Sequence, residues 1–230
     1  MKEELSRLVR IAGEEAVAKL ERSKVAVFGL GGVGSAAIEA LARSGIGRFL
    51  LVDNDRVARS NLNRQIIALQ TNLGHLKTQV TKERILSINP DASVETFECF
   101  YLPGSESPSL EDCDFVIDAI DTVSGKIRLI EECREKGIDL ISSMGTGNKF
   151  DPSRLRITAL EKTSVCPLCR VMRKEMKQRY IRNVTVLFSD EEPHKPADGS
   201  RTPGSFMPVT ACAGLMIAGY VLRKLMEEVN

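Results

Sequence analysis

Cysteine is scarce in this sequence: there are six in 230 residues, and only Cys166 and Cys169 lie close together. A secreted chain that depends on disulfides has more cysteines for its length, at regular close spacings. The composition therefore excludes a disulfide framework. It favours the reducing environment of the cytoplasm.

Long hydrophobic runs and a strong net charge are also absent. The first residues, MKEELSRLVR, lack the apolar core of a signal peptide, and the late apolar run 209–222 is too short and too rich in alanine and glycine to span a bilayer. We expect that run to be a buried helix, with no membrane partner. The formal net charge of +1 means that contact with nucleic acid requires a local basic patch.

What is present is a glycine-rich stretch at 24–55, KVAVFGLGGVGSAAIEALARSGIGRFLLVDND. An apolar run meets Gly29, Gly31 and Gly34 in G-x-G-x-x-G spacing, a helix-like run follows, and a second apolar run ends at Asp53. This is a βαβ nucleotide-binding pattern, in which glycines permit a tight turn, a phosphate close to the backbone and close helix packing. Taken alone, this pattern favours a nicotinamide or flavin dinucleotide as the ligand.

Strand-like and helix-like runs alternate along the rest of the chain, which predicts a mostly parallel sheet with helices on both faces. The expected helices are 3–21, 73–88, 123–136 and 166–180, and the expected later strands are 93–99, 115–118, 138–142, 154–160 and 184–188. We expect a Rossmann-like α/β fold in a single domain, 1–230. Its nucleotide-binding half is 1–145, and its substrate-facing extension, 146–230, is antiparallel.

Polar residues after the second apolar run favour a triphosphate. They are Asp55, then Asn61, Arg64 and Gln65 within SNLNRQ, then Lys77 at the start of the next helix. Backbone amides suffice for a diphosphate, because helix-terminus effects are worth about 0.3–1 kcal/mol each. A side-chain cation about 4 Å from a phosphate contributes on the order of 4 kcal/mol at an effective dielectric of 20. Arg64 and Lys77 therefore suit ATP; the alternative is a solvated arginine and lysine beside an asparagine-rich turn.

Two carboxylates, Asp118 and Asp121, are expected just beyond the end of a predicted strand, in the sequence DAIDT. Open α/β sheets bind ligands at the carboxyl ends of their strands. Magnesium prefers one or two carboxylates together with phosphate oxygens. We therefore expect Asp121 to be a magnesium ligand. The alternative is that Asp121 or Thr122 caps the following helix.

Together, GLGGVG, the D-x-D at 53–55, SNLNRQ, Lys77 and DAIDT resemble the ThiF, MoeB and HesA superfamily, which includes the ubiquitin-activating enzymes. Within it, ALARSGIG, NLNRQIIAL, INPDASVE and SSMGTGNKFDPSRL resemble the bacterial tRNA threonylcarbamoyladenosine dehydratases, over nearly the whole chain. The resemblance implies an enzyme that uses magnesium and ATP to adenylate the threonyl carboxylate of the modified adenosine. The carbamoyl group then closes a ring and expels AMP, which is a net dehydration.

The resemblance also implies roles for individual residues. Those expected to bind the nucleotide are Gly29, Gly31, Gly32, Gly34, Asp53 at the ribose, Asp55, Asn61, Arg64, Gln65, Lys77 and Asp121 at the magnesium. Arg64, Lys77 and Asp121 are the expected catalytic residues. Superfamily members contribute an N-terminal arginine across a homodimer interface, so a homodimer is implied, with Arg7 and Arg10 as candidates.

The cysteines distinguish this chain from the sulfur-transfer branch of the superfamily, whose members commonly have two C-x-x-C pairs for zinc and a cysteine in a long crossover loop. Here there is one pair, Cys166 and Cys169, and no cysteine in the loop 189–208. Two thiolates make half of a zinc site, and only His75 and His194 could supply imidazole, unless a dimer shares the metal. A redox pair is a further interpretation.

Two alternative functions follow from the same resemblance. One is adenylation of the C-terminus of a small ubiquitin-like sulfur carrier, with a sulfur-transfer protein as partner. The other is a nucleotide-binding scaffold without turnover, against which the intact Arg64, Lys77 and Asp121 argue.

A basic helix is predicted near the end of the chain, in the sequence RVMRKEMKQRYIR at 170–182, which has six basic residues against Glu175. Met172, Met176 and Tyr180 recur every four residues, so we expect them to anchor one helix face. The residues expected to bind tRNA phosphates are Arg170, Arg173, Lys174 and Lys177. An ordinary solvated basic helix is the alternative.

The loop at 189–208 contains four of the nine prolines. A loop of this length in a compact domain is usually a lid or is disordered. We expect either a substrate loop or a flexible connector.

Overall fold

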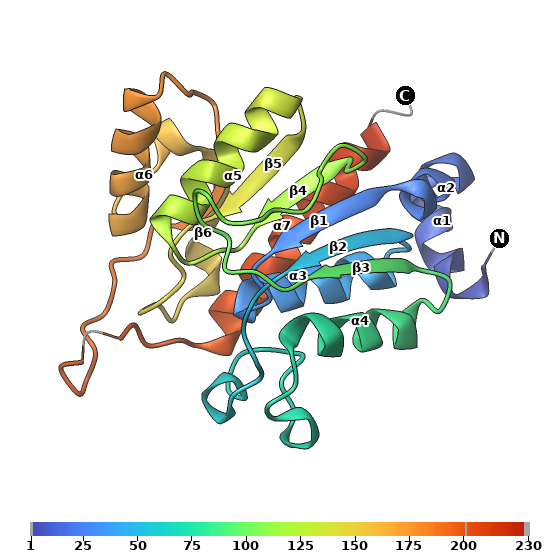
Figure 1. The fold of residues 1–230 in the computed structure, drawn as a ribbon, viewed down its shortest axis with the longest axis horizontal. Coiled ribbons are helices and arrows are strands. Elements are labelled where there is room, and N and C mark those ends of the chain that lie inside the picture. Colours follow the sequence, from blue (N-terminus) through green and yellow to red (C-terminus); the bar gives the residue numbers. More distant parts are fainter. Residues whose placement is uncertain (1, 201, 228–230) are drawn as a thin grey trace.

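The computed structural model describes residues 2–200 and 202–227, and it contains one seven-stranded sheet. The strands are β1 (Lys24–Phe28), β2 (Arg48–Val52), β3 (Ser93–Phe97), β4 (Phe115–Asp118), β5 (Asp139–Ser143), β6 (Leu155–Ala159) and β7 (Thr185–Ser189). Their order is β3-β2-β1-β4-β5-β7-β6 (Figure 1). Every neighbouring pair is parallel except β6 and β7, which are antiparallel. The expected fold class is confirmed.

Helices cover both faces of the sheet (Figure 1). They are α1 (Ser6–Ala12), α2 (Glu14–Arg22), α3 (Gly32–Arg43), α4 (Lys77–Ile88), α5 (Val123–Lys136), α6 (Pro167–Gln178) and α7 (Met207–Glu227). Side chains of α2, α3, α4 and α7 form one core with alternate residues of the central strands. On the other face α5 packs against the remaining strand residues and, with α6, against β7. Burial on both faces explains why the parallel strands are apolar almost throughout.

The N-terminal segment is not the single helix that its periodicity predicts. Gly13 has φ +86 and separates α1 from α2, and a short 3-10 helix at Glu3–Leu5 precedes α1. A continuous α-helix requires negative φ at every residue, so the chain changes direction at this glycine. Likewise α4 begins only at Lys77, because Leu76 pairs with Arg56 in an isolated β-bridge.

The closing helix α7 is long and apolar enough, by length and composition, to cross a membrane, and 44% of its apolar window is buried inside the structure. It packs along α3 as a core helix, which is the arrangement expected from the sequence. A Cβ on Gly214 would lie 2.3 Å from the carbonyl oxygen of Val33. The two helices therefore approach so closely that only glycine fits at this crossing.

Candidate active site

A pocket of about 360 Å³ opens beside the first turn of α3, at the carboxyl ends of β1, β2 and β4. Its walls come from segments that are far apart in the sequence. The predicted nucleotide-binding residues in its lining are Gly29, Gly31, Gly32, Asp53, Asp55, Asn61, Arg64, Gln65, Lys77 and Asp121. Gly34 is the predicted residue that does not line it.

The glycines of the loop between β1 and α3 divide into two kinds. Gly29 has φ +89, and a Cβ there would lie 2.5 Å from the carbonyl oxygen of Ala119; a Cβ on Gly34 would lie 1.9 Å from that of Gly29. These two glycines allow backbone segments to pack. A Cβ on Gly31 would meet only Nε2 of Gln65, at 3.9 Å, so Gly31 leaves room on the pocket side. Gly34 is outside the pocket lining, and its missing side chain serves the packing of backbone against backbone.

Asp53 joins the end of β2 to the glycine loop. One carboxylate oxygen accepts a hydrogen bond from the backbone amide of Leu30 at 2.6 Å, and the other accepts one from that of Asp55 at 2.7 Å. These contacts fix the orientation of the carboxylate in the pocket wall. Each oxygen retains a lone pair, so the group can still accept hydrogen bonds from a ribose.

Two cationic side chains border the pocket. Lys77 Nζ lies 2.8 Å from Oδ2 of Asp55, and the lysine side chain is only 5% exposed. Arg64 Nη1 donates to the carbonyl oxygen of Ser60 at 2.8 Å and to Oδ1 of Asn63 at 2.9 Å. The side-chain oxygen of Asn61 accepts from the amide of Ala58, so Asn61 shapes the turn that carries Arg64. The pocket thus presents an Arg64 guanidinium held by its own turn and a Lys77 ammonium paired with Asp55.

Gln65 gives a direct sign that the pocket suits a polar ligand. It is 6% exposed, and its Oε1 has no hydrogen-bond partner within the described part of the chain. A buried acceptor without a donor costs about 1–3 kcal/mol. A hydroxyl or amino group of a nucleotide is a suitable donor.

The two carboxylates of the DAIDT sequence have different roles. Asp118 is fully buried within β4, and both of its oxygens lie 3.1 Å from Nζ of Lys126, which is also fully buried. Asp118 also accepts from the amide of Ile120 and so shapes the turn toward Asp121. The expectation that both carboxylates stand beyond the strand is wrong, because Asp118 is in the core. Asp121 is exposed and lines the pocket.

The capping alternative for this segment finds no support. Thr122 is the N-cap residue of α5, but no side-chain hydrogen bond caps the helix. Asp121 is thus available to a ligand.

The buried pair leads to a prediction about stability. Replacing Lys126 by methionine should lower the free energy of unfolding by about 3 kcal/mol, because removing one partner leaves an uncompensated buried charge on Asp118. Lys24 is equally buried, but its partners Glu95 and Asp112 are 60% and 54% exposed. Replacing Lys24 by methionine should therefore cost about 1 kcal/mol or less. Urea unfolding of both variants measures the difference, and equal losses would contradict it.

Several pocket residues had no signal in the sequence. Thr210 reaches the pocket from the start of α7, Ser205 from the segment before that helix, Thr146 from the segment after β5, and 99–101 from the segment after β3. A Cβ on Gly32 would lie 3.0 Å from Oγ1 of Thr210, which places this hydroxyl at the helix N-terminus.

The loop 189–208 is attached to the pocket rim at its end. Asn148 accepts hydrogen bonds from the amides of His194 and Gly204, at 2.8 and 2.6 Å. Asn63 donates to the carbonyl oxygen of Ser205 at 3.1 Å. These contacts favour a substrate loop over a flexible connector.

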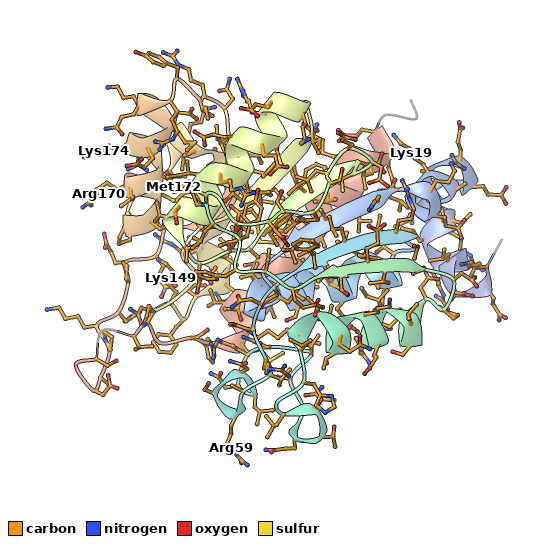
Figure 2. The ribbon with its side chains drawn as sticks, viewed as in Figure 1. Lys19, Arg59, Lys149, Arg170, Met172 and Lys174 are labelled. Atoms are coloured by element: carbon orange, nitrogen blue, oxygen red, sulfur yellow. The ribbon has the colours of Figure 1, made fainter. Side chains whose placement is uncertain are left out.

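The basic helix α6 has the predicted buried face only in part. Met172 and Met176 are buried, but Tyr180 is 92% exposed, because the helix ends at Gln178. Arg173 turns inward and donates to the carbonyl oxygen and hydroxyl of Thr163. Arg170, Lys174 and Lys177 are exposed, and Figure 2 shows the first two pointing away from the molecule.

The cysteine pair is not part of a metal site in the described residues 2–200 and 202–227. No group there has three or more histidine, cysteine, aspartate or glutamate side chains placed to hold a metal. Cys166 and Cys169 are 2% and 0% exposed. Within those residues the two thiols therefore lack the further ligands that a tetrahedral zinc site needs.

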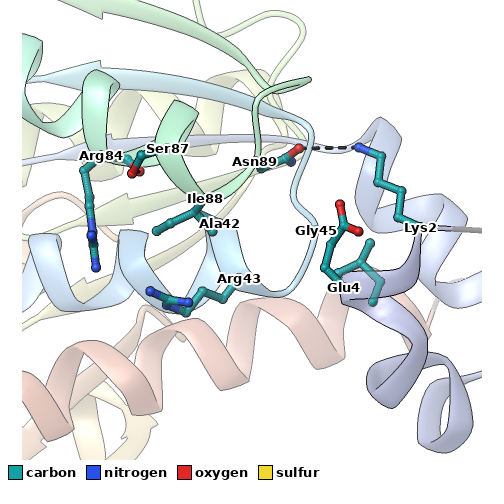
Figure 3. Close-up of a pocket in the computed structure, with 10 residues that line it drawn as sticks. Lys2, Glu4, Ala42, Arg43, Gly45, Arg84, Ser87, Ile88 and Asn89 are labelled. Atoms are coloured by element: carbon teal, nitrogen blue, oxygen red, sulfur yellow. Dashed lines mark hydrogen bonds between the residues drawn. The ribbon is translucent and has the colours of Figure 1, made fainter.

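A second hollow, of about 310 Å³, lies between the N-terminal segment, α3 and α4 (Figure 3). It is at the amino-terminal edge of the sheet, since Gly45 and Asn89 precede β2 and β3. Its arginines, Arg43 and Arg84, are already paired with Glu39. We assign no ligand to it, because open α/β sheets bind ligands at the opposite edge.

The fold and the pocket together define a Rossmann-like nucleotide-binding protein with side-chain cations suited to a triphosphate. More narrowly, the chain belongs to the ThiF family, whose profile matches residues 5–230.

Comparison with known proteins gives relatives over the full length. The chain is 39% identical to the tRNA threonylcarbamoyladenosine dehydratase of Bacillus subtilis, covering 100% of this chain and 97% of that protein. It resembles the crystal structure of Escherichia coli tRNA N6-threonylcarbamoyladenosine dehydratase in complex with AMP, with 36% identity, a TM-score of 0.92, and coverage of 98% and 95% of the two chains. The complex of that enzyme with ATP matches with 34% identity, a TM-score of 0.89, and the same coverage.

Proposed function

We propose that this protein is an ATP-dependent enzyme that dehydrates threonylcarbamoyladenosine in tRNA. The main support is the pocket at the carboxyl edge of the sheet, which combines an open glycine turn with Arg64, Lys77 and Asp121. The full-length likeness to dehydratases with AMP and ATP complexes supports the same reaction.

The reaction begins with attack of the threonyl carboxylate on the α-phosphate of ATP, which releases pyrophosphate and leaves an acyl adenylate. Backbone amides near Gly31 and the N-terminus of α3 bind phosphate oxygens, while Arg64 and Lys77 stabilise the charge that moves onto pyrophosphate. The carbamoyl group of the same residue then attacks the activated carbonyl and expels AMP. An oriented internal attack can reach an effective molarity of about 10⁵–10⁸ M, so no protein nucleophile is needed.

Magnesium fits this site through Asp121. One exposed carboxylate is enough for a metal that takes its other ligands from phosphate oxygens and water, and the ion would neutralise charge on the triphosphate. Replacing Asp121 by asparagine should raise the magnesium concentration needed for half-maximal rate by about tenfold.

The matched control for the metal site is Asp139→Asn. Asp139 is an exposed carboxylate at the start of β5, on the opposite edge of the sheet. Titrating magnesium chloride against pyrophosphate release compares the variants. An unchanged magnesium requirement for Asp121→Asn would assign the metal to other ligands.

The proposal includes a homodimer in the cytoplasm. Arg7 and Arg10 are exposed on α1, which Figure 1 shows at the end of the molecule remote from the pocket loops. An arginine there is unable to reach its own pocket, so it would serve the pocket of a partner subunit.

The outer face of α6 is the proposed tRNA surface, now limited to Arg170, Lys174 and Lys177. Replacing all three by alanine should weaken tRNA binding about tenfold or more and reduce the slope of log K against log salt by about 2–3. Lys136→Ala, an exposed lysine on α5, is the control. Binding measured over a range of salt concentrations gives both quantities, and an unchanged slope would leave α6 as a solvated helix.

One experiment tests the proposed function. The purified protein is incubated with ATP and either threonylcarbamoyl-modified tRNA or a panel of ubiquitin-like carrier proteins, and AMP and pyrophosphate are measured. Nucleoside mass spectrometry should show loss of one water from the modified adenosine. Adenylation of a carrier with unchanged tRNA would overturn the proposal and favour a sulfur-transfer partner. The buried cysteine pair and the lack of a cysteine in 189–208 argue against that outcome.

A further inference from the structure

The C-P-L-C motif at the start of α6 has no role in the reaction described above. Cys166 is the N-cap residue of α6, Pro167 occupies the first turn, and Cys169 is in the same turn. Both thiols are buried in a cluster that contains Met172 and Met176. The motif also lies against the segment after β5, since a Cβ on Gly145 would be 3.6 Å from Sγ of Cys166.

The surroundings of Cys166 favour its thiolate. The Cys169 thiol donates a hydrogen bond to Cys166 Sγ, and the backbone amides of Cys169, Gly145 and Leu168 donate as well, which lowers the pKa of Cys166. The position at a helix N-terminus acts in the same direction. The shared hydrogen bond and burial raise the pKa of Cys169, so this residue remains a thiol.

The other side of the pair is also polar. The Thr163 hydroxyl and the Arg173 guanidinium both act to lower the pKa of Cys169, against the larger raising effects of Cys166 and of burial. Arg173 is held there by its hydrogen bonds to Thr163. By contrast, burial is the main cause that raises the pKa values of Cys113 and Cys133, and nearby carboxylates act in the same direction. A thiolate acceptor and a neighbouring thiol donor therefore occur together at one place in the described chain.

We propose that Cys166 and Cys169 form a redox-active dithiol that hydrogen peroxide oxidises to a disulfide. The Cys166 thiolate attacks one peroxide oxygen and becomes a sulfenic acid, while hydroxide leaves and is protonated to water. The Cys169 sulfur then attacks Cys166, and its proton departs with the sulfenic hydroxyl as a second water. Two thiols are oxidised and one peroxide is reduced to two waters. Burial of both sulfurs selects a small oxidant over a protein partner.

The test exposes the reduced, native full chain to hydrogen peroxide at pH 7, blocks the remaining thiols and maps the peptides. We expect a Cys166–Cys169 disulfide to form about tenfold faster than oxidation at Cys113 or Cys133, since thiolate fraction outweighs the lower nucleophilicity of an acidic thiol. Both sulfurs remaining reduced while other cysteines react, or linkage only after unfolding in urea, would overturn the proposal.

Two single variants identify the roles of the sulfurs. Cys169→Ser should accumulate a sulfenic acid at Cys166 that a cyclic diketone probe labels, because the second sulfur is missing. Cys166→Ser should give no labelling at Cys169. Equal labelling in the two variants would contradict the assignment of Cys166 as the attacking sulfur. Circular dichroism of each variant shows that the fold is retained.

Discussion

Replacing Arg64 by alanine should lower the rate of pyrophosphate release about a thousandfold. A cation about 4 Å from a phosphate contributes on the order of 4 kcal/mol at an effective dielectric of 20, and each 1.4 kcal/mol is a factor of ten in rate. Among the described residues the guanidinium hydrogen-bonds within its own turn, to Ser60 and Asn63, so removing it should leave the fold intact. Pyrophosphate release with modified tRNA measures the effect.

The control for this variant is Arg59→Ala. Arg59 begins the 3-10 helix that precedes Arg64, is exposed and does not line the pocket (Figure 2). Both variants should unfold thermally like the parent chain, and only Arg64→Ala should lose turnover. Full turnover by Arg64→Ala would remove the triphosphate role assigned to this residue.

Replacing Gly34 by alanine should cost more than about 4 kcal/mol of unfolding free energy and leave little folded protein. Its Cβ would lie 1.9 Å from the carbonyl oxygen of Gly29, an atom of the backbone that has no flexible end to move away. Solubility and urea unfolding measure this loss. The strand, the turn and α3 meet at this contact, so no local repacking relieves it.

Gly31→Ala is the variant to compare with Gly34→Ala. A Cβ there would have free space on the pocket side, with Gln65 Nε2 at 3.9 Å as its neighbour. This variant should fold normally but bind ATP about tenfold or more weakly, because the methyl group occupies the space of a phosphate oxygen. ATP binding by calorimetry measures it. A stably folded Gly34→Ala would contradict the packing role assigned to Gly34. An unchanged affinity of Gly31→Ala for ATP would contradict the phosphate-binding role assigned to Gly31.

Local patterns were enough to predict the strands and most of the pocket. Residues 24–55 combine spacing, apolar runs and a terminal acid, and each of these reports on adjacent backbone. The burial of Asp118 and the exposure of Asp121 were not predictable. They depend on Lys126 of α5, whose ammonium group pairs with the buried carboxylate of Asp118. Gly13 and Tyr180 were assigned to helices by spacing, although positive φ at both residues takes them out of the helix.

The contributions of the C-terminal half were the least predictable. Thr210 reaches the pocket through the long-range packing of α7 along α3, and Ser205 lies just before that helix. No short pattern in the sequence predicts either contact. The inward turn of Arg173 likewise depends on Thr163, ten residues earlier in the chain. Side-chain direction on a charged helix is set by such partners and not by spacing alone.

The close crossing of α3 and α7 has a consequence for synthesis. The helix that begins at the phosphate-binding turn rests on Gly214, and Thr210 completes the wall of the same pocket. Both residues belong to α7, Met207–Glu227, which lies far along the chain from that turn. A ribosome therefore makes the glycine turn well before it makes the helix that supports it. ATP is unable to assist the folding of the nascent chain before α7 has been made.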